Sequence, residues 1–168
     1  VTVSLWQYGA EAQPQNDFCF EGSGPGGRQL VAHIPWGNSH VYGDPQGNYD
    51  RIHKSAGPDE FKGQWNYWVF TKDRLAGTMK IYLNGALWHS GTKKTRSYQP
   101  ITTFELGASA DGSDNYDGAL DEFRVSTKSR TPAWIKAQYK SMTDALLVYG
   151  GQEGSITAAQ HASEPNVN

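Results

Sequence analysis

The sequence has almost nothing that could cross-link the chain and no stretch that could cross a membrane. Cys19 is the single cysteine among 168 residues, so no disulfide can form within the chain. It stands between Phe18 and Phe20, and we interpret it as a small buried thiol in a strand. No run approaches the ~20 apolar residues of a membrane helix. Lys and Arg are scattered and the formal net charge is −2, so we expect neither a membrane span nor a nucleic-acid partner.

What the sequence does contain is typical of β-structure. Aromatic residues make up 12% of the chain, and 19 glycines supply turn positions. Short alternating segments separated by turn residues every ~8–12 positions favour a sandwich or barrel. A long irregular loop is expected over residues 43–59. The segments that we predict as strands are 1–8, 17–21, 29–36, 40–42, 64–72, 78–83, 86–89, 101–108, 118–126 and 145–149.

One helix and one tight hairpin have clear local signals. Thr131 can cap a helix, Pro132 fits its first position, and apolar residues keep helical spacing up to Met142. Asn84 and Gly85 lie between two alternating runs, and both tolerate a positive φ, which predicts a hairpin turn.

Four strand motifs and this helix follow one another in a specific order. WNYWVFT (65–71) precedes MKIYLNG (79–85), and FELG (104–107) and GALDEFRV (118–125) come before the helix. The ordered set resembles the laminin G-like domains of bacterial secreted proteins, within the concanavalin A-like lectin/glucanase superfamily. Tyr67 stands where that family usually has His. The resemblance implies an antiparallel two-sheet jelly-roll sandwich, ligand binding at one rim or on the concave sheet, and often a structural calcium ion.

The expected fold class is therefore all-β, with two antiparallel sheets in a jelly-roll sandwich and one short C-terminal helix. Residues 1–150 should form this domain, and residues 151–168 a polar tail or linker. Because Val1 already begins a strand-like run, we interpret the chain as a piece of a longer precursor.

Catalytic signatures are missing from the sequence. The glucanase branch of the resembling superfamily carries its carboxylates on one strand, but no Glu here is followed by Asp two positions later. Asp121 and Glu122 are adjacent, so in a regular strand they would point to opposite faces. No Gly-x-Ser-x-Gly or metalloprotease motif occurs either. We expect a domain without enzymatic activity.

A sugar site is the leading hypothesis for the segment around residues 36–53. Sugars present apolar C–H faces and hydroxyl rims, so their sites combine aromatic rings with planar polar groups. The alternative is that the aromatic residues pack at the rim and the polar ones are solvated. The predicted ligand-binding residues are Trp36, His40, Tyr42, Tyr49, Arg51 and His53.

The remaining tryptophans are expected to pack rather than to bind. Trp6, Trp65, Trp68 and Trp88 all lie in predicted strands, so we assign them to the core or to sheet faces. On this reading, Trp65→Ala should destabilise the domain by ~3–5 kcal/mol.

Calcium is the third candidate ligand. The polar segment 111–117 supplies Asp111, Asp114 and Asp117, whose oxygens are the ligand type that calcium prefers. Asp121 belongs to the motif that lies near the common ion site in the resembling family. A plain polar turn, and a hydrogen-bonding role for Asp121, are the alternatives. The five histidines show no zinc spacing.

Three functions remain in order of preference. The first is a carbohydrate-binding or adhesion module of a larger secreted or cell-surface protein, acting beside other domains of that protein. The second is a protein-interaction or spacer domain, since this fold is widely reused. The third is a divergent glycan-cleaving enzyme.

Overall fold

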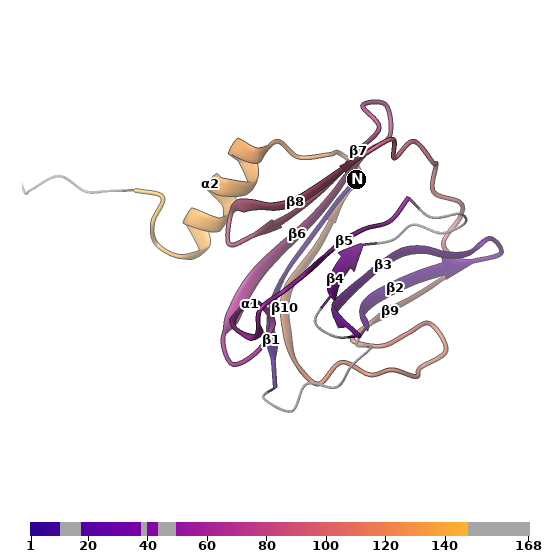
Figure 1. Ribbon diagram of the computed structural model, residues 1–168, viewed down its shortest axis with the longest axis horizontal. Coiled ribbons are helices and arrows are strands. Elements are labelled where there is room, and N and C mark those ends of the chain that lie inside the picture. Colours follow the sequence, from indigo (N-terminus) through magenta and orange to yellow (C-terminus); the bar gives the residue numbers. More distant parts are fainter. Residues whose placement is uncertain (11–17, 38–39, 44–49, 148–168) are drawn as a thin grey trace, which may run out of the picture.

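The computed structural model describes residues 1–10, 18–37, 40–43 and 50–147. These form two five-stranded antiparallel sheets, as predicted (Figure 1). The first sheet has the order β10 (Gly118–Ser126), β1 (Thr2–Gly9), β6 (Trp65–Asp73), β7 (Thr78–Leu83), β8 (Ala86–Thr92). The second has the order β5 (Ile52–Ser55), β4 (His40–Gly43), β3 (Gly27–Trp36), β2 (Phe18–Gly24), β9 (Thr103–Leu106).

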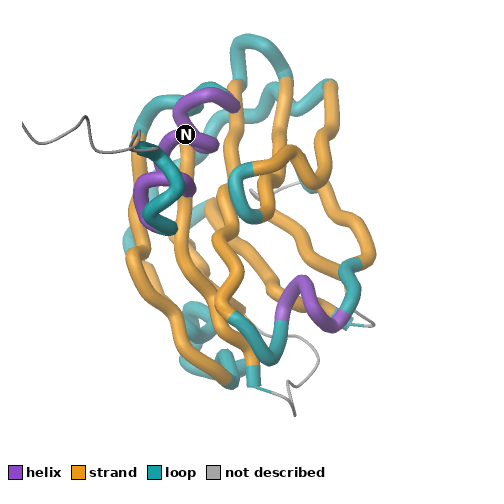
Figure 2. Tube along the Cα trace, turned by 90° about the vertical axis from the view of Figure 1, so that its left-hand side faces the viewer, coloured by secondary structure: helices purple, strands orange, loops and turns teal. Residues whose placement is uncertain are grey.

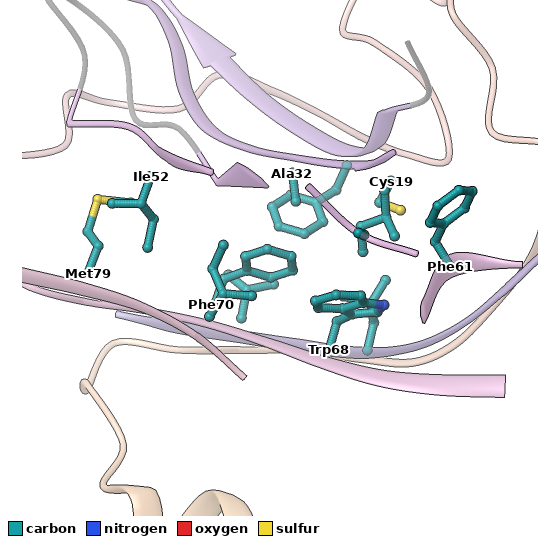
Figure 3. Packing of buried hydrophobic residues seen from close by; sticks show 13 residues of the cluster. Cys19, Ala32, Ile52, Phe61, Trp68, Phe70 and Met79 are labelled. Carbon is teal, nitrogen blue, oxygen red and sulfur yellow. The ribbon is translucent and has the colours of Figure 1, made fainter. Parts of the chain in front are cut away.

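The core lies between the two sheets, where inward-facing apolar side chains of both sheets form one cluster. Trp68 and Phe70 of β6 point inward from the first sheet and meet Cys19 and Ala32 of the second (Figure 3). Leu5 of β1 belongs to the same cluster. Trp68 and Cys19 are fully buried, which confirms the interpretation of Cys19 as a core thiol. This packing makes the two sheets a single sandwich.

The C-terminal helix, α2 (Pro132–Met142), begins where the sequence predicts. The Thr131 side chain accepts a hydrogen bond from the Trp134 amide, and Pro132 occupies the first turn. Ile135 is fully buried against Tyr67 and Val69, which lie on the outer face of the first sheet. The helix therefore forms a third layer outside that sheet (Figures 1 and 2).

The hairpin between β7 and β8 also forms as predicted. Asn84 and Gly85 have φ values of 50° and 78°. The Asn84 side chain accepts from the Tyr67 amide at 2.8 Å, so the turn is fastened to β6. A Cβ on Gly85 would lie 3.0 Å from the Tyr139 ring, so glycine also lets α2 approach the turn.

Two predicted segments differ from the structure. Residues 43–59 are not one irregular loop, because they include β5 and the one-turn helix α1 (Pro58–Phe61). Gly57 precedes α1, and its amide donates to the Glu60 carboxylate at 2.8 Å, a local contact that propensity alone does not reveal. The strand expected at residues 145–149 is wrong over residues 145–147, which form no strand, and residues 148 and 149 lie outside the described part.

Candidate functional site

The structure brings most of the predicted sugar-binding residues to neighbouring strands of the second sheet. Tyr42 is the register partner of both His33 and His53, and Trp36 is the partner of His40. Arg51 directly precedes β5, whereas Tyr49 lies outside the described residues.

Within that group, the Trp36 ring packs against two neighbouring rings. Its centroid lies 4.4 Å from that of His33 and 5.9 Å from that of Phe18. His33 in turn stacks edge-on against Phe18 at 4.2 Å. Trp36 is half-buried, so these contacts leave only part of the indole for a ligand.

The four predicted calcium ligands differ in their hydrogen bonds and in their places in the fold. The Asp111 carboxylate accepts hydrogen bonds from the Ser109 and Ser113 hydroxyls, and these bonds hold the pKa of Asp111 well below its usual range. Asp114 accepts the Phe18 amide, and Asp117 the Ala10 amide, through backbone carbonyls.

Within the described ranges, no three His, Cys, Asp or Glu side chains cluster closely enough to hold a metal ion. Asp121 belongs to a different setting, in strand β10. Calcium binding therefore stays a prediction.

A second candidate site lies on the outer face of the first sheet, beside α2. It was not predicted from the sequence. It is a hollow of about 440 Å³. We call it the Trp6–Trp65 hollow. Its lining residues are Trp6, Trp65, Asp121, Glu122 and Met142.

A β-bulge places both carboxylates in this hollow. Between Ser4 and Trp6 the β1 strand advances two residues, while its partner β10 advances three, from Arg124 to Asp121. Glu122 has a φ of 51°, and its amide donates to the Asp121 carboxylate at 2.7 Å. The expectation that Asp121 and Glu122 point to opposite faces is therefore wrong, because that rule holds only for a regular strand.

Several contacts fix the aromatic wall of the hollow. The Trp6 indole donates to the Met142 sulfur at 3.4 Å, and its ring lies 5.2 Å from that of Tyr67. The Trp65 ring lies 5.8 Å from that of Tyr8. Trp6 is thus held between the sheet and the end of α2, whereas Trp65 stands at the open side.

Trp65 is 47% exposed, so of the two expected places, the core and a sheet face, it occupies the sheet face. It is the first residue of β6, where the strand emerges from the sandwich. Trp68, three residues later, is fully buried, and Trp88 packs edge-on against it at 5.2 Å. A hollow that combines a half-exposed indole, a second indole and two carboxylates is a candidate binding site.

Glu122 makes one further contact, an ion pair with Arg124. Both residues are about half exposed, so the pair contributes little to stability. It orients the Glu122 carboxylate at the edge of the hollow. Asp121 also lines the hollow.

Comparison with known proteins identifies the family. The model of the concanavalin A-like lectin/glucanases superfamily, Laminin_G_3, matches residues 1–136. The chain belongs to this superfamily. No curated protein matches the chain significantly. The resemblance seen in the sequence motifs is thereby confirmed, together with the jelly-roll class.

Solved structures share the fold at low sequence identity. Domain 4 of AbnA, a GH43 extracellular arabinanase from Geobacillus stearothermophilus, was solved with arabinotriose and aligns with a TM-score of 0.63 at 21% identity over 80% of this chain. The receptor-binding domain of botulinum neurotoxin mosaic serotype C/D aligns at 0.66 and 16% identity over 83%. The serotype D ligand-binding domain, in complex with N-acetylneuraminic acid, aligns at 0.64 and 15% over 83%. This chain spans 64%, 36% and 36% of those three chains.

Among the described residues, no helix is both long and apolar enough to span a membrane.

Proposed function

We propose that this domain is a non-catalytic carbohydrate-binding module and that the sugar binds in the Trp6–Trp65 hollow. The observation that carries the proposal is that the half-exposed Trp65 indole, Asp121 and Glu122 line the same hollow of about 440 Å³. That size lies within the usual range of small-ligand sites, roughly 300–1,000 Å³.

The chemistry of the hollow matches that of a sugar ring. The apolar C–H face of a pyranose or furanose can lie on the Trp65 indole, while its hydroxyls donate to the Asp121 and Glu122 oxygens. The contacts of Trp6 with Met142 and Tyr67 fix the second wall before any ligand enters, so little ordering cost falls on binding.

The parent protein, on this proposal, is secreted or displayed at the cell surface, and this module holds it on glycan. Two of the structural relatives were solved with sugars, arabinotriose and N-acetylneuraminic acid, and one belongs to an extracellular enzyme. These relatives support the choice of ligand class, and the hollow supports the choice of place.

A second candidate, glycan cleavage, draws on the presence of both carboxylates in one hollow. A glycoside hydrolase needs one carboxyl group that donates a proton and one that acts as nucleophile or base. Here Glu122 is paired with Arg124, and Asp121 accepts the Glu122 amide. Because both carboxyl groups accept in these contacts and neither donates a proton, we favour sugar binding over glycan cleavage.

The test is a glycan array with calcium and again with a chelator, followed by calorimetric titration of arabinotriose and of the strongest array ligand. Trp65→Ala should abolish measurable binding, while Trp36→Ala, in the other candidate site, should leave it unchanged. Binding lost in Trp36→Ala and kept in Trp65→Ala would move the site to the second sheet. Release of reducing sugar from an array ligand would establish the enzyme instead, and silence on a folded domain would favour a protein-interaction role.

A further inference from the structure

A second, larger hollow lies at the end of the sandwich where β1 begins. Its volume is about 520 Å³, and no residue in the described part of the chain lines both this hollow and the Trp6–Trp65 hollow. We call it the basic hollow. Among the described residues that line it, the charged side chains are Lys72, Arg74, Arg96 and Lys128 and one carboxylate, Asp73.

Three separate segments of the chain each bring one exposed cation to this hollow. Arg74 lies in the turn between β6 and β7, Arg96 in the connection from β8 to β9, and Lys128 in the segment between β10 and α2. Figure 1 shows these three segments converging near the labelled N-terminus. Cations from three segments converge here through the tertiary fold, so a linear search for basic runs misses them.

The segment that carries Arg96 is held by a buried ion pair. Lys72 donates to Asp50 at 2.7 Å, and the two side chains are 2% and 8% exposed. The Asp50 carboxylate also accepts a hydrogen bond from the Arg96 backbone amide at 2.6 Å. The Tyr98 ring lies 5.3 Å from the Lys72 nitrogen. The backbone at Arg96 is thereby fixed to the sandwich, and its guanidinium extends from a rigid base.

The other two segments are fixed as well. In the β6–β7 turn, the Ala76 amide donates to the Asp73 carboxylate at 3.0 Å. The Thr2 hydroxyl donates to the Lys128 carbonyl at 2.8 Å, which ties the segment after β10 to β1. All three walls of the hollow are therefore in place without a ligand.

The charge of the hollow is opposite to that of the whole chain. Counted over the described residues, four cationic side chains against Asp73 and the adjoining Asp50 leave two net positive charges, in a chain whose formal net charge is −2. Hydroxyls of Ser97, Thr127 and Ser129 stand among them. Guanidinium and ammonium groups with hydroxyls are the donors that carboxylates and sulfates accept from.

We propose that the basic hollow binds an acidic saccharide through its carboxylate or sulfate ester. A free inorganic oxyanion would fill a small part of about 520 Å³, whereas a sugar ring would also use the Tyr98 ring and the hydroxyls. The site is independent of the Trp6–Trp65 hollow, whose two carboxylates disfavour an anionic ligand. The domain then holds two glycan sites of opposite charge preference.

The test uses three defined probes in calorimetric titrations: trigalacturonate, 6-sulfogalactose and the neutral galactotriose. The carboxylated and sulfated probes should bind, and galactotriose should bind at least about tenfold more weakly in the hollow. Arg96→Gln and Arg74→Gln should each lower the affinity for the acidic probes by about tenfold, because each removes a charge-assisted hydrogen bond. Raising the salt concentration from about 50 mM to about 500 mM should also lower the affinity for the acidic probes.

Lys136→Gln supplies the matched control, because Lys136 is an exposed cation on α2 outside the hollow. It should leave both acidic probes unaffected. Trp65→Ala should also leave them unaffected, which separates this site from the proposed sugar site. Folding of each variant is checked by its melting temperature, and the Asp50 bond to the Arg96 amide remains in Arg96→Gln. Equal affinity of the Trp65→Ala domain for neutral and acidic probes, equal losses in Lys136→Gln and Arg96→Gln, or no binding of either acidic probe at about 10 mM would overturn the proposal.

Discussion

Trp65 and Trp68 lie three residues apart on β6, and replacing each by alanine should have different consequences. Trp68→Ala should mainly lower stability, whereas Trp65→Ala should mainly abolish glycan binding. Trp68 is fully buried, packs against Trp88, and donates its indole N–H to the Gln7 side chain at 3.3 Å. Trp68→Ala removes this packing, opens a cavity and leaves a buried Gln7 oxygen without its donor. Large-to-small core changes of this kind cost about 3–5 kcal/mol. For a domain of this size, the melting temperature should fall by about 6–20 °C.

Trp65 should behave differently, because about half of its surface is in solvent. Full burial of a large side chain contributes about 1.5–3 kcal/mol, so half-burial accounts for about 1 kcal/mol. The space that Trp65→Ala leaves is open to water, which removes the cavity cost. The melting temperature should therefore fall by only about 2–4 °C. Binding of a neutral oligosaccharide should be lost, since the indole is the exposed platform.

The assay is thermal unfolding followed by circular dichroism, with glycan titration on the same samples. A Trp65→Ala domain destabilised as strongly as Trp68→Ala would show that Trp65 belongs to the core and that the hollow is not a prepared surface. A stable Trp65→Ala domain with unchanged glycan affinity would refute the placement of the sugar.

Three further perturbations test other parts of the structure. Thr131→Ala should cost about 1 kcal/mol, measured by urea unfolding, because it removes the acceptor for the Trp134 amide. Glu122→Gly should keep or raise the melting temperature, since glycine adopts the φ of 51° without strain, yet weaken glycan binding in titration. Burial acts to raise the pKa of Asp50, but hydrogen bonds from Lys72 and from the Arg96 amide outweigh it and hold the pKa below 3.8. A lowered carboxyl pKa stabilises the fold above pH 3.8 and loses that contribution as the pH falls through the folded value, so Asp50→Asn should flatten the acid limb of a melting-temperature profile.

Much of the fold could be predicted from local sequence. The β6 and β7 strands, the Asn84-Gly85 turn and the capped helix from Pro132 all carry short-range signals, and each lies where predicted. The β5 strand and α1 are harder to predict because each has only four residues, so pairing with β4 decides the structure of β5 and the Gly57–Glu60 contact supports α1. Strand propensities do not contain the pairing with a neighbouring strand.

The candidate sites were harder to predict, for physical reasons that differ between them. The bulge at Glu122 inverts the rule that neighbouring strand residues face apart, and nothing in GALDEFRV signals a positive φ at that residue. The exposure of Trp65 depends on where β6 leaves the sandwich, which an alternating pattern does not show. The closeness of Trp36 and His40, by contrast, follows from two adjacent predicted strands, although the structure has a register shift between His33 and Trp36.

The most direct test of the account is a titration of the strongest neutral array ligand into three proteins: the unaltered domain, Trp65→Ala and Trp36→Ala. We predict equal affinity for the unaltered domain and Trp36→Ala, and no measurable binding by a folded Trp65→Ala. Retained binding by Trp65→Ala together with its loss in Trp36→Ala would contradict the central claim and place the sugar on the second sheet.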